Sequence, residues 1–255
     1  MSDLRSRSVV RFPRVTERWL KNAAALLTLL VNFGAVVVER GLIGVEGYSY
    51  SQLLTAMDVP GLTQLVGLAA VLRLSRGLLP PLFAFLLVEG FLHTSNYARY
   101  LAGVSLSALV SELAYDFAMT GQVLDLSQQS PMLALTVCLV MLYILRLPER
   151  MDTLERIICQ TLIILCAVFW ALLLRVESGL ETVLLTAVFY LLREKRTARL
   201  LTGVLVSLLD PTGPMAFCAI ALYSGERKLK VNKYAYYLLY PFELILFGVT
   251  VHFFL

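Results

Sequence analysis

The sequence predicts an all-α, polytopic integral membrane protein: a helical bundle with about eight to ten transmembrane helices. Of its 255 residues, 58% are hydrophobic and only 16% are charged, whereas soluble domains contain roughly 45–50% apolar and about 25% charged residues. Such a chain has too few polar residues to cover a soluble globule, so the lipid bilayer is its expected environment. The basic residues fall in short clusters between apolar runs, which is typical of cytoplasmic loops and does not indicate a nucleic-acid partner.

The N-terminal part divides into a basic arm, residues 1–18, and a first span, residues 19–38. We expect the arm to be cytoplasmic, because it is rich in arginine and directly precedes the span. Trp19 and Lys21 are suited to anchor the span at the membrane interface. No polar region long enough for a soluble domain follows, so residues 19–255 are predicted to form a single transmembrane domain.

Residues 61–79 are apolar but interrupted by Gln64, Arg73 and Arg76, which predicts a re-entrant or interfacial segment. The charge distribution supports this prediction. If the segment does not cross, the later basic clusters all fall on the same side as the N-terminal arm, as the positive-inside rule requires. These clusters lie at residues 146–156, 193–199 and 227–233.

Further apolar segments account for the rest of the bundle. They lie at residues 78–93, 101–115, 131–147, 157–174, 179–192, 200–209, 214–223 and 234–255. The first of them is broken by Pro80–Pro81, and two prolines are expected to end one helix and begin another. The chain shows no division into two similar halves of the kind that many transporters have.

Glu89 and His93 form the first candidate site, because they lie four residues apart and therefore share one face of a helix. The carboxylate can hold the imidazole in one tautomer, and the imidazole can then act as a general base. An acid within an apolar segment is costly in a membrane and usually lines a protein interior or an aqueous cavity. The alternative is a buried, hydrogen-bonded pair at a helix end.

Three more carboxylates lie in apolar or loop-flanking sequence. Glu112 and Asp116 are also four residues apart, and Gln129 follows in a polar loop. Together they suggest a substrate-binding mouth, or else a helix end that meets water. Glu243 lies inside the last span, where an acid is costly unless it is paired. The candidate partners for Glu243 are Lys233, Arg99 and His93.

The loop at residues 226–237 is basic, and its lysines, Lys233 among them, could hold the phosphates of a coenzyme. The alternative is a cytoplasmic loop kept inside by its charge. The chain has no phosphate-binding lysine loop and no dinucleotide fingerprint. Its four cysteines all lie in apolar runs without a metal-ligand spacing, so no metal is expected.

Several of these motifs occur in the order found in a known family. They are FAFLLVEGFLHTSNYARYL at residues 83–101, SELAYDFAMTG at 111–121, a Ser-Gln loop, FYLLREK at 189–195 and NKYAYYLLYPFELILF at 232–247. The chain resembles the TraX family over roughly residues 19–250. That family is similar to membrane acyltransferases that move acyl groups, usually from acetyl-CoA, onto acceptors at the membrane, and it is associated with acetylation of conjugative pilin.

The resemblance implies an acetyl-CoA-dependent acyltransferase in a bacterial inner membrane, with the N-terminus in the cytoplasm. His93 would be the base and Glu89 its orienting acid, and Arg99 and Lys233 would pair with coenzyme phosphates. Glu112, Asp116, Gln129 and Glu243 would bind the acceptor, an amine or hydroxyl of a pilin-like peptide or a surface glycan.

The chain departs from the family pattern at three places. Asn32-Phe33 stands where family members typically carry Asp-His, Glu177-Ser178-Gly179 replaces Asp-Tyr-Gly, and Glu243 replaces the histidine of a Pro-Leu-His motif. Two histidines of the family are therefore missing. This leaves open two further interpretations: a non-catalytic TraX-like membrane protein and a small-solute transporter. The acceptor, the acyl group and the oligomeric state are not predicted.

Overall fold

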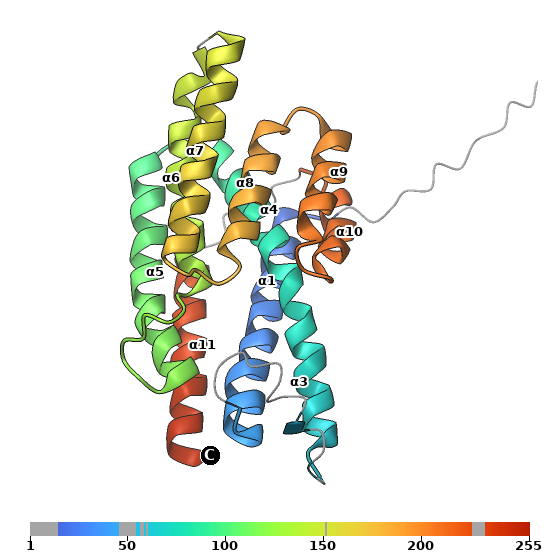
Figure 1. The fold of residues 1–255 in the computed structure, drawn as a ribbon, viewed down its shortest axis with the longest axis vertical. Helices are drawn as coiled ribbons and strands as arrows, with labels where there is room; N and C mark the ends of the chain where they lie inside the picture. Colours follow the sequence, from blue (N-terminus) through green and yellow to red (C-terminus); the bar gives the residue numbers. More distant parts are fainter. Residues whose placement is uncertain (1–14, 46–54, 57–58, 60, 151, 226–232) are drawn as a thin grey trace, which may run out of the picture.

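The computed structural model describes residues 15–45, 55–56, 59, 61–150, 152–225 and 233–255. Across these residues the regular secondary structure is helical, and the helices lie side by side as an elongated bundle (Figure 1). Four helical runs of this described part are long and apolar enough to cross a membrane, and three shorter apolar helices accompany them. The predicted class, an all-α polytopic membrane bundle, is confirmed, and the chain is an integral membrane protein.

The bundle is built from α-helices joined by short π-helical and 3₁₀ segments. In chain order they are α1 (Glu17–Asn32), π-helical η1 (Phe33–Ile43), α3 (Thr63–Ser75), 3₁₀ η2 (Arg76–Leu78), α4 (Leu79–Leu92), α5 (Tyr97–Thr120), α6 (Pro131–Leu145), 3₁₀ η3 (Leu147–Arg150), α7 (Thr153–Leu173), α8 (Gly179–Leu191), α9 (Arg196–Ser207), 3₁₀ η4 (Gly213–Met215), α10 (Ala216–Ala221) and α11 (Lys233–Phe254).

Residues 63–92 form one long helical run made of α3, η2 and α4. The segment at 61–79, expected to be re-entrant or interfacial, is thus not a separate crossing, but it does not turn back either. It is the first half of the crossing that α4 completes. Pro80 and Pro81 lie in the first turn of α4, directly after the 3₁₀ turn, where a missing N–H costs no helical hydrogen bond. The prolines therefore begin α4 without interrupting the helical run.

Local signals fix both ends of α5, the helix that follows. The Asn96 side chain accepts a 2.9 Å hydrogen bond from the backbone N–H of Arg99 and so caps the N-terminus. At the other end Gly121 has a φ of 77°, in the left-handed region that favours glycine. The Arg40 guanidinium donates to the carbonyl oxygens of Phe117 and Ala118 at 3.1 and 2.5 Å, which attaches this helix end to η1.

The pair α9 and α10 forms a hairpin that only partly enters the bundle. The 12-residue α9 is about 18 Å long and the 6-residue α10 about 9 Å, whereas a bilayer core is about 30 Å thick. The Arg196 side chain, at the start of α9, donates to the carbonyl of Ala221 at the end of α10. Both ends of the hairpin therefore lie together, beside α8 (Figure 1), and the segments expected at 200–209 and 214–223 make no complete crossing.

The core of the bundle is aromatic and aliphatic, and the outside is equally apolar. Phe85 of α4 and Phe189 of α8 are completely or almost completely buried, with ring centroids 5.5 Å apart. By contrast, Leu162, Leu165 and Phe169 on α7 are each more than half exposed. A helix with a wide exposed apolar face belongs in lipid, because water would penalise that surface.

Candidate functional site

A cavity of about 380 Å³ runs inside the bundle between α1, α4, α5, α6, α8 and α11. Polar side chains gather at its two ends, and mainly apolar side chains line the middle. The exposed end is lined by Glu17, Lys21, His93, Thr94 and Tyr236, and the deep end by Asn32, Arg76, Glu177, Tyr240 and Glu243. The distance between the two ends follows from α1, which runs from Glu17 to Asn32, about 22 Å of helix.

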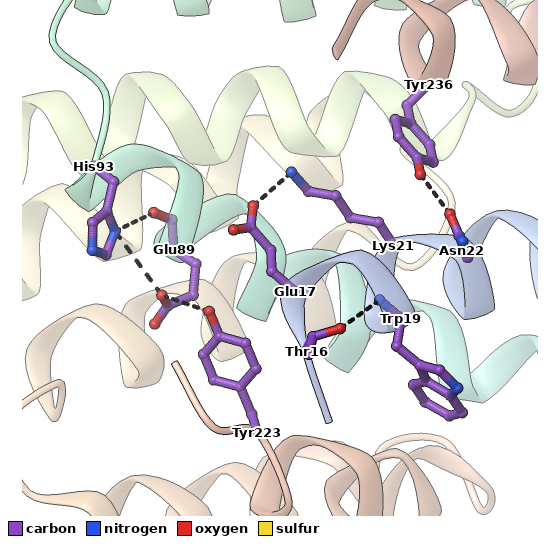
Figure 2. Close-up of polar contacts among 9 residues, drawn as sticks. All are labelled: Thr16, Glu17, Trp19, Lys21, Asn22, Glu89, His93, Tyr223 and Tyr236. Atoms are coloured by element: carbon purple, nitrogen blue, oxygen red, sulfur yellow. Dashed lines mark hydrogen bonds and ion pairs between the residues drawn. The ribbon is translucent and has the colours of Figure 1, made fainter. Parts of the chain in front are cut away.

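Polar contacts within α1 and between α1 and α11 organise the exposed end (Figure 2). Lys21 Nζ lies 2.6 Å from Glu17 Oε1, one turn away on α1. The Tyr236 hydroxyl of α11 donates to Asn22 Oδ1 at 2.5 Å, which ties the last helix to the first. The charged pair Glu17–Lys21 therefore lies at the same end of the cavity as His93.

His93 lies at the C-terminal end of α4, half exposed, with its ring turned toward Glu89 (Figure 2). Its Nδ1 is 2.8 Å from the main-chain carbonyl oxygen of Glu89. A carbonyl only accepts, so Nδ1 carries the proton and Nε2 is left as an acceptor. This tautomer has the basic nitrogen that a general base requires.

The Glu89 carboxylate was expected to orient the His93 imidazole, but it makes no hydrogen bond to the ring. Its Oε2 is 4.0 Å from His93 Nδ1, within ion-pair range but too far for a hydrogen bond. It accepts a weak 3.5 Å contact from the Tyr223 hydroxyl, and it interacts electrostatically with the Arg199 guanidinium of α9. Glu89 thus orients the imidazole through its main chain, while its carboxylate connects α4 to the hairpin.

Of the two residues expected to hold coenzyme phosphates, Arg99 has a described side chain, and it does not line the cavity. Arg99 is exposed in the first turn of α5, six residues beyond His93. Lys233 is the first residue of α11, and its side chain lies outside the part of the chain that the structure describes. Another cation of this part of the bundle, Arg146, lies over two aromatic rings. Its Cζ is 5.9 Å from the ring centroid of Phe91 and 5.7 Å from that of Tyr97.

Two pairs of side chains from distant parts of the sequence meet at the deep end. Asn32 Nδ2 donates to Glu243 Oε1 at 2.7 Å, across 211 residues of sequence. Arg76 forms an ion pair with Glu177, whose Oε2 also accepts a 2.6 Å hydrogen bond from the Tyr115 hydroxyl. The expected partners of Glu243 were Lys233, Arg99 and His93. Its hydrogen-bond partner in the structure is Asn32, because α1 and α11 pack together here.

Glu112, Asp116 and Gln129 do not line the cavity, and their contacts hold loops. Glu112 Oε2 accepts the backbone N–H of Ser130 at 3.0 Å, and Asp116 Oδ2 accepts that of Asp125 at 3.0 Å. The backbone of Gln129 pairs with residues 175–177. These contacts hold the loops that precede α6 and α8. The role of the three residues in binding an acceptor stays a prediction.

Sequence reasoning did not single out Arg76, Tyr115 or Tyr240 as site residues. The available signal was Arg76 itself, since a basic residue within an apolar run predicts a buried partner. Asn32 and Glu177 were noticed only as departures from a family pattern, and with Glu243 they line one end of one cavity. Asn32 also ends α1 at its junction with η1, and π-helical segments frequently occur at functional sites.

A family model described as TraX protein matches residues 65–251, well over half of the chain. The matched part contains His93, Glu177 and Glu243, and Asn32 precedes it. No curated protein and no solved structure matches the chain.

Proposed function

The chain belongs to the TraX family, and on this premise we propose that it is a membrane-embedded acyltransferase. It would transfer an acetyl or other acyl group from acyl-CoA to an amine or hydroxyl of an exported or membrane-associated acceptor. The observation that carries the proposal is the cavity of about 380 Å³, with an imidazole at its exposed end whose Nδ1 contacts a main-chain carbonyl. Small-molecule sites typically measure about 300–1,000 Å³.

The shape of the cavity suits the acyl arm of the coenzyme better than its nucleotide. The apolar middle, with Phe83, Leu86 and Leu135, fits a slender chain, and phosphate groups would stay with the basic residues at the exposed end. Lys21 lines that end, and Arg99 lies on the exposed surface nearby. Acyl-CoA, when bound, supplies an activated thioester.

The proposed chemistry uses His93 as a general base. Its Nε2 would accept the proton of the acceptor's amine or hydroxyl as that group bonds to the acyl carbon, and the Glu89 carbonyl would stabilise the resulting imidazolium through Nδ1–H. As the carbon–sulfur bond of the thioester breaks, the imidazolium would return the proton to the departing thiolate. Removing such a base typically costs about 10²–10⁴-fold in rate. The Glu17–Lys21 ion pair lines the same exposed end of the cavity as His93.

The proposed location is a bacterial inner membrane with the N-terminus in the cytoplasm. The start of α1 lies beside the end of α10, since the Val15 backbone pairs with Leu222 and Ser224. Basic residues of the α8–α9 connection and of α9 flank the same end, among them Arg193 and Arg196. The positive-inside rule assigns such an end to the cytoplasm, which is where acyl-CoA is available.

One observation favours the non-catalytic alternative. Asn32 and Glu243 stand at two positions where the chain departs from the family pattern, and they contact each other inside the cavity. Calorimetric titration of the detergent-solubilised protein with acetyl-CoA separates the two functions. Saturable binding that free CoA displaces supports the acyltransferase. Absence of binding, together with absence of labelled acetyl transfer into membrane extract, would leave the non-catalytic function.

A further inference from the structure

The deep end of the cavity contains a carboxylate whose charge no described side chain neutralises. Glu243 is 3% exposed. Its Oε1 accepts from Asn32, and its Oε2 has no hydrogen-bond partner among the described residues. An asparagine amide is neutral, so it orients the carboxylate without balancing it. Isolated buried charges are expensive, above all within a membrane.

The other charged groups of the deep end do not supply the missing cation. Arg76 is engaged by Glu177 in an ion pair. Next to it, Arg73 Nη1 lies 3.6 Å from Glu39 Oε2. Each of these cations thus has a carboxylate of its own, and with all groups ionised the described lining of the deep end would have an excess of one negative charge. Its potential favours a cationic guest and disfavours an anionic one.

The hydrogen-bonding groups of the deep end favour a small ligand that donates hydrogen bonds. Tyr240 lies one helical turn before Glu243 on α11, so both side chains face the cavity. The Tyr240 hydroxyl is buried and, like Glu243 Oε2, lacks a hydrogen-bond partner within the described chain. A primary ammonium group has three N–H donors and one positive charge. It can donate to Glu243 Oε2 and to the Tyr240 oxygen while its carbon chain occupies the apolar middle of the cavity.

We propose that the deep end is a binding subsite for a primary ammonium group, with Glu243 and Tyr240 as its acceptors and Asn32 as a positioning residue. The inference deepens the proposed function, since it makes the acceptor a cationic, elongated molecule that enters with its ammonium group first. Its nucleophile would then lie toward His93. The ammonium group has two possible sources: an aliphatic amine or a peptide.

Ligand titrations of the detergent-solubilised full chain test the subsite. The probes are n-butylamine, its neutral counterpart n-butanol, and alanyl-alaninamide, which carries a peptide N-terminus. We expect n-butylamine to bind in preference to n-butanol, and Glu243→Gln to weaken amine binding about 10–100-fold, the value of a charged hydrogen bond. The comparison of n-butylamine with alanyl-alaninamide identifies the source of the ammonium group.

Glu155→Gln is the matched control, because it removes an exposed carboxylate of α7 that does not line the cavity. It should leave amine binding within about twofold of the wild type. Equal binding of n-butylamine and n-butanol to the wild-type protein would overturn the subsite even if Glu243→Gln did not fold. So would equal losses in the two variants.

Acetyl-CoA titration in the same samples keeps the two proposals separate. Glu243-dependent amine binding without acetyl-CoA binding would support the subsite and contradict the acyltransferase. Acetyl-CoA turnover onto neutral hydroxyl acceptors, without amine binding, would contradict the subsite and support the acyltransferase.

Discussion

Replacement of Tyr115 by phenylalanine removes a single hydroxyl group that contacts Glu177 at the deep end of the cavity. That hydroxyl donates to Glu177 Oε2 at 2.6 Å, and the tyrosine is 3% exposed. The substitution creates no large cavity, because the ring stays in place. A hydrogen bond to a charged group contributes about 1.5–3 kcal/mol. At roughly 2–4 °C per kcal/mol for a chain of this size, Tyr115→Phe should lower Tm by about 3–12 °C.

Thermal unfolding in detergent measures this effect, with Tyr143→Phe as the matched control. Tyr143 is 51% exposed, and its ring contacts Tyr97, so loss of its hydroxyl should leave Tm nearly unchanged. Equal shifts in the two variants would refute the conclusion that α5 is attached to the Arg76–Glu177 pair through this hydrogen bond.

Two further predictions concern helix packing. Gly203→Ala places a Cβ 2.5 Å from the Phe217 ring of α10 and should destabilise the α9–α10 hairpin by about 1–3 kcal/mol. Gly67→Ala in α3, where an added Cβ meets no atom within 4 Å, should not lower Tm, because alanine favours a helix more than glycine does; equal losses of Tm in the two variants would contradict the packing. Arg40→Met removes the charged donor from the Ala118 carbonyl and should cost about 1.5–3 kcal/mol. Hydrogen exchange should then rise in the last turn of α5, and unchanged protection there would argue against the cap.

Much of the fold follows from local sequence signals. Pro131 begins α6 and Gly179 begins α8, at the positions where the predicted spans begin. Proline fits the first helical turn, where no N–H is needed. The same rule applies at Pro80–Pro81. As expected, one helix, α3, ends before these prolines and another, α4, begins with them, and the 3₁₀ turn η2 joins the two into one helical run.

The site was harder to predict, because its contacts depend on how distant helices pack. Four-residue spacing places Glu89 and His93 on one face, but spacing does not reveal that the main-chain carbonyl holds the imidazole at 2.8 Å. The Asn32–Glu243 hydrogen bond joins the first span to the last. No local pattern encodes such a pair; an acid inside a span indicates only that a partner or a polar cavity exists.

The most direct measurement is thiol release from acetyl-CoA by the purified, detergent-solubilised protein, with host membrane extract as the source of acceptor. The comparison is between the wild-type protein and His93→Ala. We predict release by the wild type and a loss of about 10²–10⁴-fold in the variant, the usual contribution of a general base. Undiminished release by His93→Ala would move the base elsewhere, and no release by the wild type would contradict the acyltransferase itself.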